Sequence, residues 1–260
     1  MIDKGEYMSL EINLEGKVAI VTGAGRGIGR AVAVALAKAG ADICVTARTE
    51  EQINQTAELV RSQNRKAVAV SADAAVARSV EGVVDKTIAE LGGVHLLINN
   101  AGVLVPKSLL ETSEAEFDRV MDTNVKSMFH FTKAVGPHFI ANKYGRIVNM
   151  ASVGAFVAAP SRSTYHTSKG AVVMFTKSMA IEWARYNILI NAVAPGYIET
   201  DLISHISSDE TKLSRYLKAI PLRRLGKVEE VAQLVAFLCS DLASYMTGSV
   251  VVADGGLLIS

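Results

Sequence analysis

The stretch VAIVTGAGRGIG, residues 18–29, joins a short apolar run to a glycine-rich loop, and a helical pattern follows over residues 27–39. Glycines at such a turn let the backbone approach a pyrophosphate, and the free N–H groups of the helix face that anion. The spacing fits GxxxGxG, and no Gly-Lys-Ser/Thr follows, which excludes a P-loop triphosphatase. We therefore predict a dinucleotide site at this turn. The loop residues assigned to it are Gly23, Gly25, Arg26, Gly27, Ile28 and Gly29.

The same alternation of apolar runs and helical patterns continues to the end of the chain. Strands are predicted at residues 17–22, 42–47, 67–71, 95–99, 145–150, 188–193 and 249–252. Helices are predicted at residues 27–39, 50–63, 76–91, 113–141, 164–186 and 227–240. Repeated strand–helix–strand units form parallel sheets, and strands that are apolar at nearly every position are covered by helices on both faces. We therefore predict an α/β fold, a Rossmann-type doubly wound seven-stranded parallel sheet in a single domain over residues 1–260.

Two segments lie outside this alternation. Residues 1–13 precede the first strand and are predicted to be an N-terminal extension. Residues 197–220 include a mixture of polar and apolar side chains that fits no strand. An insertion of this length predicts a lid that closes over the substrate.

Composition argues against several classes of protein. The 260 residues carry a net charge of +1, so no long-range field attracts nucleic acid. No apolar stretch approaches about 18 residues and no apolar targeting segment begins the chain, so no membrane span is expected and the expected location is cytoplasmic. Cys44 and Cys239 show no metal-ligand spacing, nor do the five histidines, so we predict no metal site and place both cysteines in the core.

The end of the second predicted strand indicates which dinucleotide binds. Enzymes that use NAD place an Asp or Glu there to hold the ribose 2′-hydroxyl, whereas this chain has Thr46-Ala47-Arg48-Thr49. Arg48 and Arg26 offer guanidinium groups that suit a 2′-phosphate. NADP(H) is therefore favoured, with NAD(H) as the alternative if Arg48 is only a solvated surface residue. Residues 49–52 are assigned to a capping box, whose carboxylates meet a helix N-terminus.

The strongest chemical signal is Ser152 after the fifth predicted strand, followed by Tyr165 and Lys169. An i,i+4 spacing puts Tyr165 and Lys169 on one helical face. At about 4–5 Å, an ammonium favours the phenolate by about 3–4 kcal/mol before desolvation, or roughly two to three pKa units. We expect Tyr165 to act as general acid/base and Ser152 to hold the substrate oxygen.

These motifs, in this order, resemble the short-chain dehydrogenase/reductase family over residues 14–257. The resemblance adds Asn99-Asn100-Ala101-Gly102, a helical Asn124 and Pro195-Gly196. It implies that Lys169 also binds the nicotinamide ribose, and that Asn124 holds a water linking this lysine to solvent. The further cofactor contacts that it implies are Asp73 and Ala74 near adenine, Asn99 beside the adenosine ribose, Ala101, Gly102, Tyr165, Lys169, Pro195 and Gly196 along the site, and Ile198 and Thr200 at the carboxamide.

Within that family the chain looks most like the 3-oxoacyl-[acyl-carrier-protein] reductases, through residues 221–226 and Asp254-Gly255-Gly256. Residues expected around the substrate are apolar, which favours a hydrophobic carbonyl or alcohol such as a 3-oxoacyl thioester. They are Leu104, Val105, Ala155, Phe156, Val157, Leu202, Ile203 and Ile206. Pro137 and Ile181 stand where carrier-protein-dependent members place arginines, so use of the acyl carrier protein stays open.

The resemblance leaves three alternatives to this function, and it also implies an oligomeric assembly. The alternatives are a general ketone or alcohol dehydrogenase, a sugar or steroid dehydrogenase that uses NAD(H), and a non-catalytic NADP(H) sensor. Sensors commonly lose the tyrosine or the lysine, and both are present here. The family usually forms tetramers, so we expect a homotetramer through the helices at 113–141 and 164–186. The apolar residues assigned to its contacts are Met128, Phe129, Phe131, Met174 and Phe175.

Overall fold

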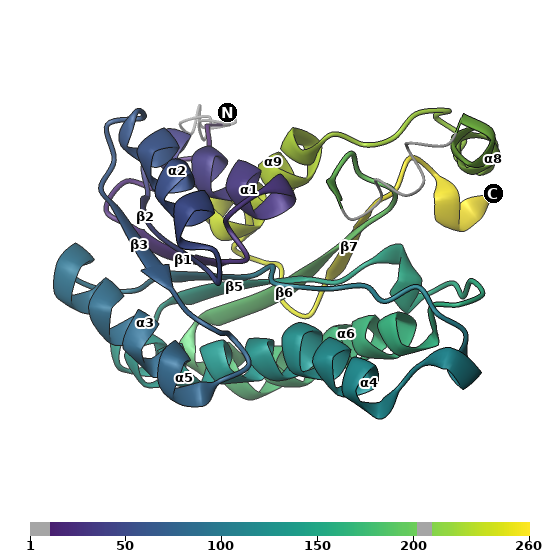
Figure 1. Ribbon diagram of the computed structural model, residues 1–260. Helices are drawn as coiled ribbons and strands as arrows, with labels where there is room; N and C mark the ends of the chain where they lie inside the picture. Colours follow the sequence, from purple (N-terminus) through teal and green to yellow (C-terminus); the bar gives the residue numbers. More distant parts are fainter. Residues whose placement is uncertain (1–10, 202–209) are drawn as a thin grey trace, which may run out of the picture.

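The computed structural model of the protein describes residues 11–201 and 210–260, and its strands in these ranges form one parallel sheet (Figure 1). The strands are β1 (Val18–Thr22), β2 (Asp42–Ala47), β3 (Ala67–Ser71), β4 (Leu96–Asn99), β5 (Gly145–Met150), β6 (Ile188–Pro195) and β7 (Val250–Ala253). Their order is β3-β2-β1-β4-β5-β6-β7 and every pairing is parallel. The predicted seven-stranded parallel sheet is therefore confirmed.

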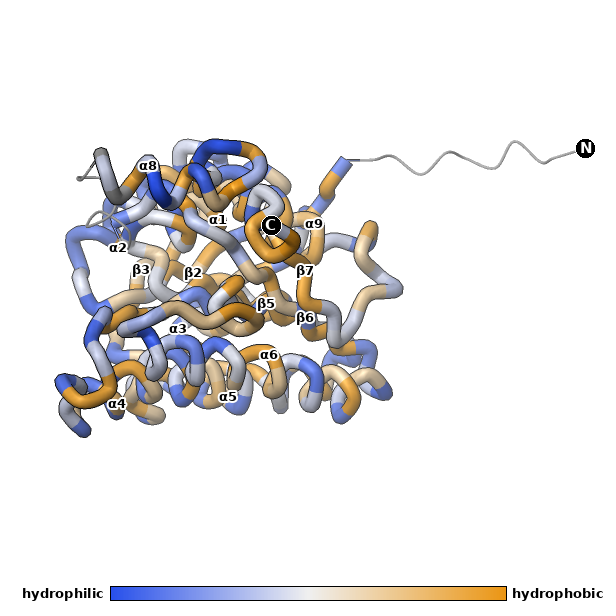
Figure 2. The backbone as a smooth tube through the Cα atoms, turned by 90° about the vertical axis from the view of Figure 1, so that its right-hand side faces the viewer, coloured by the Kyte–Doolittle hydropathy of each residue, from blue (hydrophilic) through white to orange (hydrophobic). Residues whose placement is uncertain are grey.

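Helices cover both faces of this sheet, as the apolar strands predict. One face carries α1 (Gly27–Lys38), α2 (Glu50–Arg61) and α9 (Val228–Cys239), and the other carries α3 (Ala77–Leu91), α5 (Ser127–Asn142) and α6 (Ser163–Trp183) (Figure 1). β1, β4 and β5 are buried at every position because both their faces are covered. Figure 2 shows hydrophobic strands between the two helical layers.

The core contains both cysteines, as expected. Cys44 and Cys239 are fully buried, and burial raises the pKa of each thiol to about 12. Met128 and Phe131 are also buried, which corrects their assignment to a contact surface between subunits. Hydrophobic periodicity alone did not separate the side of this helix that faces the sheet from the side that faces outward.

The long helix predicted at residues 113–141 has three parts. α4 (Glu114–Met121) leads into a π-helical turn at Asp122–Lys126, and α5 follows without a break. A π turn accommodates one extra residue in a helix and is common at functional sites. The turn contains Asn124, whose side chain is buried.

The segment after β6 includes a helix that the sequence did not predict, α8 (Glu210–Ala219). Its apolar residues pack with Ile220, Leu225 and Leu257, and Ser260 Oγ donates a hydrogen bond to the Ala219 carbonyl at 3.0 Å, so α8 lies beside the C-terminal turn (Figure 1). Two predicted segments lie partly outside the described residues. These parts are residues 202–209 of the predicted lid at 197–220 and residues 1–10 of the predicted extension at 1–13. None of the described helices combines the length and apolar character that crossing a membrane requires.

Candidate active site

The strand order reverses beside β1, because the chain runs outward through β2 and β3 and then returns to β4. In doubly wound folds, ligands bind at the carboxyl ends of the strands beside this reversal. A pocket of about 1360 Å³ opens there. All the residues assigned to the cofactor line it, with the exception of Asn99, and so do Ser152, Tyr165 and Lys169.

The glycine-rich loop packs closely against the end of β4. A Cβ on Gly29 would lie 2.3 Å from the Gly23 carbonyl oxygen and 2.5 Å from Asn100 Nδ2, and Gly23 itself has a φ of +62°. Asn100 Nδ2 donates to the carbonyls of Thr22 (2.9 Å) and Gly23 (3.2 Å). No larger residue fits at Gly29 without displacing the loop, and the bare backbone there suits a pyrophosphate. The role of the Asn100 side chain was not anticipated.

The Asn99 side chain lies in the core and not in the pocket, so it does not support the predicted place of Asn99 beside the adenosine ribose. Asn99 Nδ2 donates to Asn149 Oδ1 at 2.9 Å, and the side chain does not line the pocket. Successive side chains of a strand point to opposite faces, so Asn99 and Asn100 diverge. This alternation was the signal in the sequence that distinguishes the two asparagines.

The two arginines assigned to the 2′-phosphate are both exposed at the rim of the pocket, but their surroundings differ. Arg26 Nη1 forms an ion pair with Asp201 Oδ2 at 3.0 Å, which links the glycine loop to the segment after β6. Arg48 follows β2, and its backbone carbonyl accepts a hydrogen bond from Ser71 Oγ at 3.1 Å. Of the two guanidinium groups, that of Arg26 is already engaged across the mouth of the pocket.

The opposite side of the glycine loop is fastened to α2 by a residue that sequence reasoning missed. Arg30 Nη2 donates to the Gly25 carbonyl at 2.5 Å and Nε donates to Thr56 Oγ1 at 3.1 Å. The buried Thr56 hydroxyl donates in turn to the Ala24 carbonyl at 2.9 Å. Thr49 is the N-cap of α2, but its side chain makes no capping hydrogen bond, so the predicted capping box is wrong. The carboxylates of Glu50 and Glu51 do lie in the first turn of this helix, as predicted.

Tyr165 and Lys169 lie together near the start of α6, as their spacing predicts. Lys169 Nζ is 5.7 Å from the centroid of the Tyr165 ring and donates to the Met150 carbonyl at 2.7 Å. Ser152 follows β5, its Oγ accepts from the Gly154 N–H at 3.1 Å, and its hydroxyl acts to lower the pKa of Tyr165. The three side chains therefore converge on one end of the pocket.

The electrostatics of this trio differ from the expectation. Burial raises the pKa of Tyr165, and the hydrogen bond with Ser152 and the charge of Arg162 only partly oppose that rise. Burial also lowers the pKa of Lys169 to about 8. The expected fall of the phenol pKa is therefore corrected, because desolvation penalises both the phenolate and the ammonium. A protonated phenol in this position is suited to giving a proton to a carbonyl oxygen.

Asn124 connects the loop after β4 to α6. Its Oδ1 accepts from the Val103 N–H at 2.7 Å, and its Nδ2 donates to the Val103 carbonyl at 2.9 Å and to Ser168 Oγ at 3.0 Å. The π turn presents this amide to both partners, and Ser168 directly precedes Lys169. Asn124 thus holds the loop that carries Gly102 against α6, the helix that carries Lys169. A water held by Asn124 stays a prediction.

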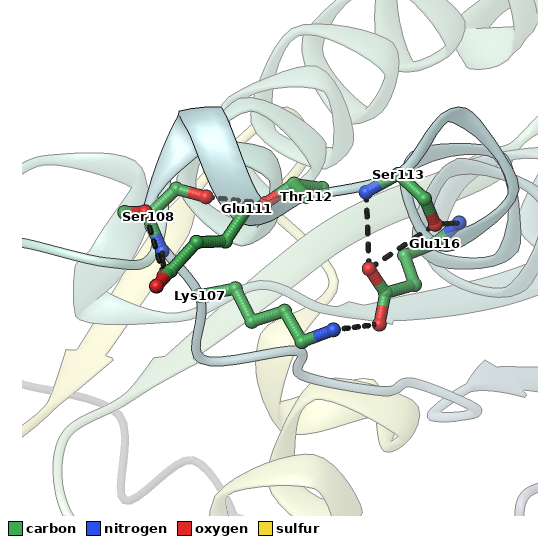
Figure 3. Close-up of polar contacts among 6 residues, drawn as sticks. All are labelled: Lys107, Ser108, Glu111, Thr112, Ser113 and Glu116. Atoms are coloured by element: carbon green, nitrogen blue, oxygen red, sulfur yellow. Dashed lines mark hydrogen bonds and ion pairs between the residues drawn. The ribbon is translucent and has the colours of Figure 1, made fainter.

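The loop that leads from the pocket to α4 is braced by two consecutive capping boxes (Figure 3). Glu111 Oε2 accepts from the hydroxyl of Ser108 at 2.7 Å, and Glu116 Oε2 accepts from the backbone N–H of Ser113 at 3.0 Å. Lys107 Nζ pairs with Glu116 Oε1 at 2.6 Å, and this hydrogen bond is the main reason why the pKa of Glu116 falls to about 2. The loop therefore has a defined shape at the pocket rim.

The apolar wall expected around the substrate is only partly assembled by the described residues. Leu104 lines the pocket and Val105 is buried, whereas Phe156 and Val157 are nearly half exposed. Leu202, Ile203 and Ile206 lie outside the described residues. Within residues 11–201 and 210–260, no group of three His, Cys, Asp or Glu residues is placed to hold a metal ion.

Comparison with known proteins agrees with this arrangement. A family model described as enoyl-(acyl carrier protein) reductase matches residues 23–258. The 3-oxoacyl-[acyl-carrier-protein] reductase FabG of Aquifex aeolicus is 40% identical over 249 residues, which cover 95% of this chain and all of the relative. A short-chain type dehydrogenase/reductase from Mycobacterium marinum has a TM-score of 0.92 at 36% identity, covering 96% of this chain and 98% of the other. A gluconate 5-dehydrogenase from Burkholderia cenocepacia, solved with NADP and tartrate, has a TM-score of 0.92 at 35% identity, covering 96% and 98%.

Proposed function

The chain belongs to the short-chain dehydrogenase/reductase family of oxidoreductases, and on this premise we propose that it transfers a hydride between NADP(H) and a ketone or secondary alcohol. The observation that carries the proposal is the convergence of Ser152, Tyr165 and Lys169 in the pocket that the glycine loop also lines. A non-catalytic sensor has no use for an acid/base pair at that position.

The proposed reaction divides the work between these side chains. When bound, the nicotinamide supplies or accepts the hydride. In the direction of reduction, Ser152 orients the carbonyl oxygen, Tyr165 gives it the phenolic proton, and the carbonyl carbon gains the hydride, so the products are a secondary alcohol and NADP⁺. Lys169 stabilises the phenolate that remains until a proton from solvent replaces the one transferred. Oxidation of the alcohol uses the same groups in reverse.

The glycine loop and the end of β2 support NADP(H) as the cofactor. Gly23 and Gly29 let the loop pack tightly at the N-terminus of α1, whose N–H groups suit a pyrophosphate, and Arg48 provides a cation where enzymes that use NAD carry a carboxylate. The Burkholderia relative is named as a complex with NADP. NAD(H) is the alternative cofactor, and it predicts that removing Arg48 leaves the preference between the two dinucleotides unchanged.

Two substrate classes follow from the relatives and the pocket. The first is a 3-oxoacyl thioester or similar hydrophobic ketone, supported by the FabG relative and by Leu104 at the pocket. The second is a hydroxy or oxo acid, supported by the gluconate 5-dehydrogenase relative. A panel of acyl thioesters, ketones, sugar acids and alcohols, followed by NADPH and NADH absorbance, separates the two classes.

The test of the mechanism is Tyr165→Phe, which keeps the ring and removes the proton. We expect turnover to fall by at least about 100-fold, in line with the loss of a general acid, while NADPH binding measured by fluorescence stays unchanged. Asn142→Ala, at an exposed position at the end of α5, is the matched control. Turnover equal to that of the wild-type protein would reject Tyr165 as the acid.

We also propose a homotetramer, on the exposure of apolar side chains along α5, α6 and the end of the sheet. Phe129, Met174 and Ile181 are 45%, 59% and 83% exposed, and Tyr245 is fully exposed. Such large apolar surfaces are typical of subunit contacts. Light scattering at micromolar concentration tests this assembly, and a monomer peak contradicts it. Binding of an acyl carrier protein is a separate question, which titration with the isolated carrier answers.

A further inference from the structure

Arg162 joins three elements on the substrate side of the molecule. It directly precedes α6, and its Nη2 donates to the Tyr216 hydroxyl of α8 at 3.2 Å. Its charge also acts on Tyr197, which follows β6. The rings of Tyr197 and Tyr216 meet edge to face with their centroids 4.7 Å apart. The half-buried guanidinium is therefore bonded to one phenol of this pair, that of Tyr216.

Both of these phenols are neutral, which is unusual for the surroundings of a guanidinium that is partly withdrawn from water. Arg224 has a bidentate ion pair with Glu230 (2.8 and 2.6 Å), whereas no carboxylate among the described residues pairs with Arg162. A guanidinium has five N–H donors, more than one phenol oxygen uses. Partial burial of a cation without a countercharge is costly, and an anion that enters with the substrate would offset that cost.

The charge of Arg162 also reaches the proposed reacting group. Arg162 and Tyr165 are three residues apart at the start of one helix, and the cation lowers the pKa of Tyr165 in opposition to burial. The same charge acts on His166 and Tyr197. Tyr197 follows Gly196, which lines the pocket. Arg162 itself does not line the pocket, but it lies within one helical turn of Tyr165, which does.

We propose that Arg162 binds a carboxylate of the substrate, so that the protein acts on oxo acids and hydroxy acids in preference to neutral ketones. The inference rests on the function proposed above and names the substrate class of the same site. A planar guanidinium binds a carboxylate through two parallel hydrogen bonds, and its bond to Tyr216 fixes its orientation. The substrate is then bound at two points, with its carboxylate at Arg162 and its carbonyl oxygen at Ser152 and Tyr165. The carboxylate stays ionised throughout the hydride and proton transfers.

The experiment compares short oxo acids with their methyl esters, which keep the ketone and lose the charge. For the wild-type protein we expect kcat/KM to be higher for the acids. Arg162→Gln should lower kcat/KM for the acids by about 10–150-fold, the range for loss of a hydrogen-bonded charge, and leave the esters within about threefold of wild type. Arg162→Lys should restore part of the loss, because it keeps the charge without the planar fork. Arg185→Gln, which removes an arginine stacked on Tyr186 after the other end of α6, is the matched control.

Two results would overturn the proposal. Equal losses for acids and esters in Arg162→Gln would mean that Arg162 only supports α8, and a wild-type protein without preference for the acids would remove the reason for an anion site. Calorimetric titration of the same acid and ester in the presence of NADP⁺ tests the contact without turnover. Acid binding that depends on Arg162 in a protein that reduces no ketone would contradict the proposed function alone. An active reductase whose acid preference is unchanged in Arg162→Gln would contradict this inference alone.

Discussion

Replacement of Asn124 by alanine tests whether its amide holds the active-site loop against α6. The change leaves the N–H and the carbonyl of Val103 without their partners, which are 2.7 and 2.9 Å away in the wild-type protein. Each orphaned, partly buried backbone group costs about 1–2 kcal/mol, so the free energy of unfolding should fall by about 2–4 kcal/mol. For a chain of this length, that loss lowers Tm by about 4–16 °C. Ser168 loses one bond as well, but its hydroxyl still donates to the Tyr165 carbonyl at 2.7 Å.

Thermal and urea unfolding measure the stability of this variant, and turnover measures its effect on the site. Because the loop and Lys169 lose their common support, we expect kcat to fall by about 10–100-fold, the cost of misplacing reacting groups by about 1 Å. Asn142→Ala, exposed at the end of α5, should stay within about 0.5 kcal/mol of wild type. A loss below about 1 kcal/mol for Asn124→Ala, with turnover unchanged, would refute the bracing role that its three hydrogen bonds suggest.

Three other perturbations probe the cofactor site and the buried lysine. Arg48→Ala should weaken NADPH binding by about 10–150-fold and change NADH binding little. Arg26→Ala should have a smaller effect, because the Arg26 guanidinium is already paired with Asp201. Equal losses for both dinucleotides in a fluorescence titration would contradict the assignment of Arg48 to the 2′-phosphate. Burial lowers the pKa of Lys169 from 10.5 to about 8, so the unfolded chain binds more protons between these values and this group makes stability rise with pH there. The free energy of unfolding of wild type minus that of Lys169→Met should therefore increase from pH 8 to 10.5, and a flat difference would show that the lysine is not desolvated. Gly29→Ala would place a Cβ 2.3 Å from the Gly23 carbonyl oxygen, so it should destabilise the protein by about 1–3 kcal/mol and weaken NADPH binding. Gly82→Ala, at an open helical position, should stabilise the protein by about 0.5–1 kcal/mol. Similar melting temperatures for the two variants would contradict the close approach at Gly29.

Local patterns were sufficient to predict the architecture of this protein. The strands from β1 to β7 begin and end within two residues of the predicted limits. Burial on both faces of a sheet requires apolar residues at successive positions, and such runs are visible in the sequence. The loop at Gly23 was recognisable because a close backbone approach requires glycine at particular positions. The pairing of Tyr165 with Lys169 was predictable since helical geometry alone puts an i,i+4 pair on one face.

What the tertiary structure decided depends on contacts between residues far apart in the chain and on burial. Arg26 meets Asp201 175 positions later, and Arg162 meets Tyr216 54 positions later, and no periodicity predicts such encounters. The pKa of Tyr165 was misjudged for the same reason. Attraction between two neighbouring charges follows from their spacing in the sequence, but the desolvation that outweighs it is produced by every segment that packs around the site.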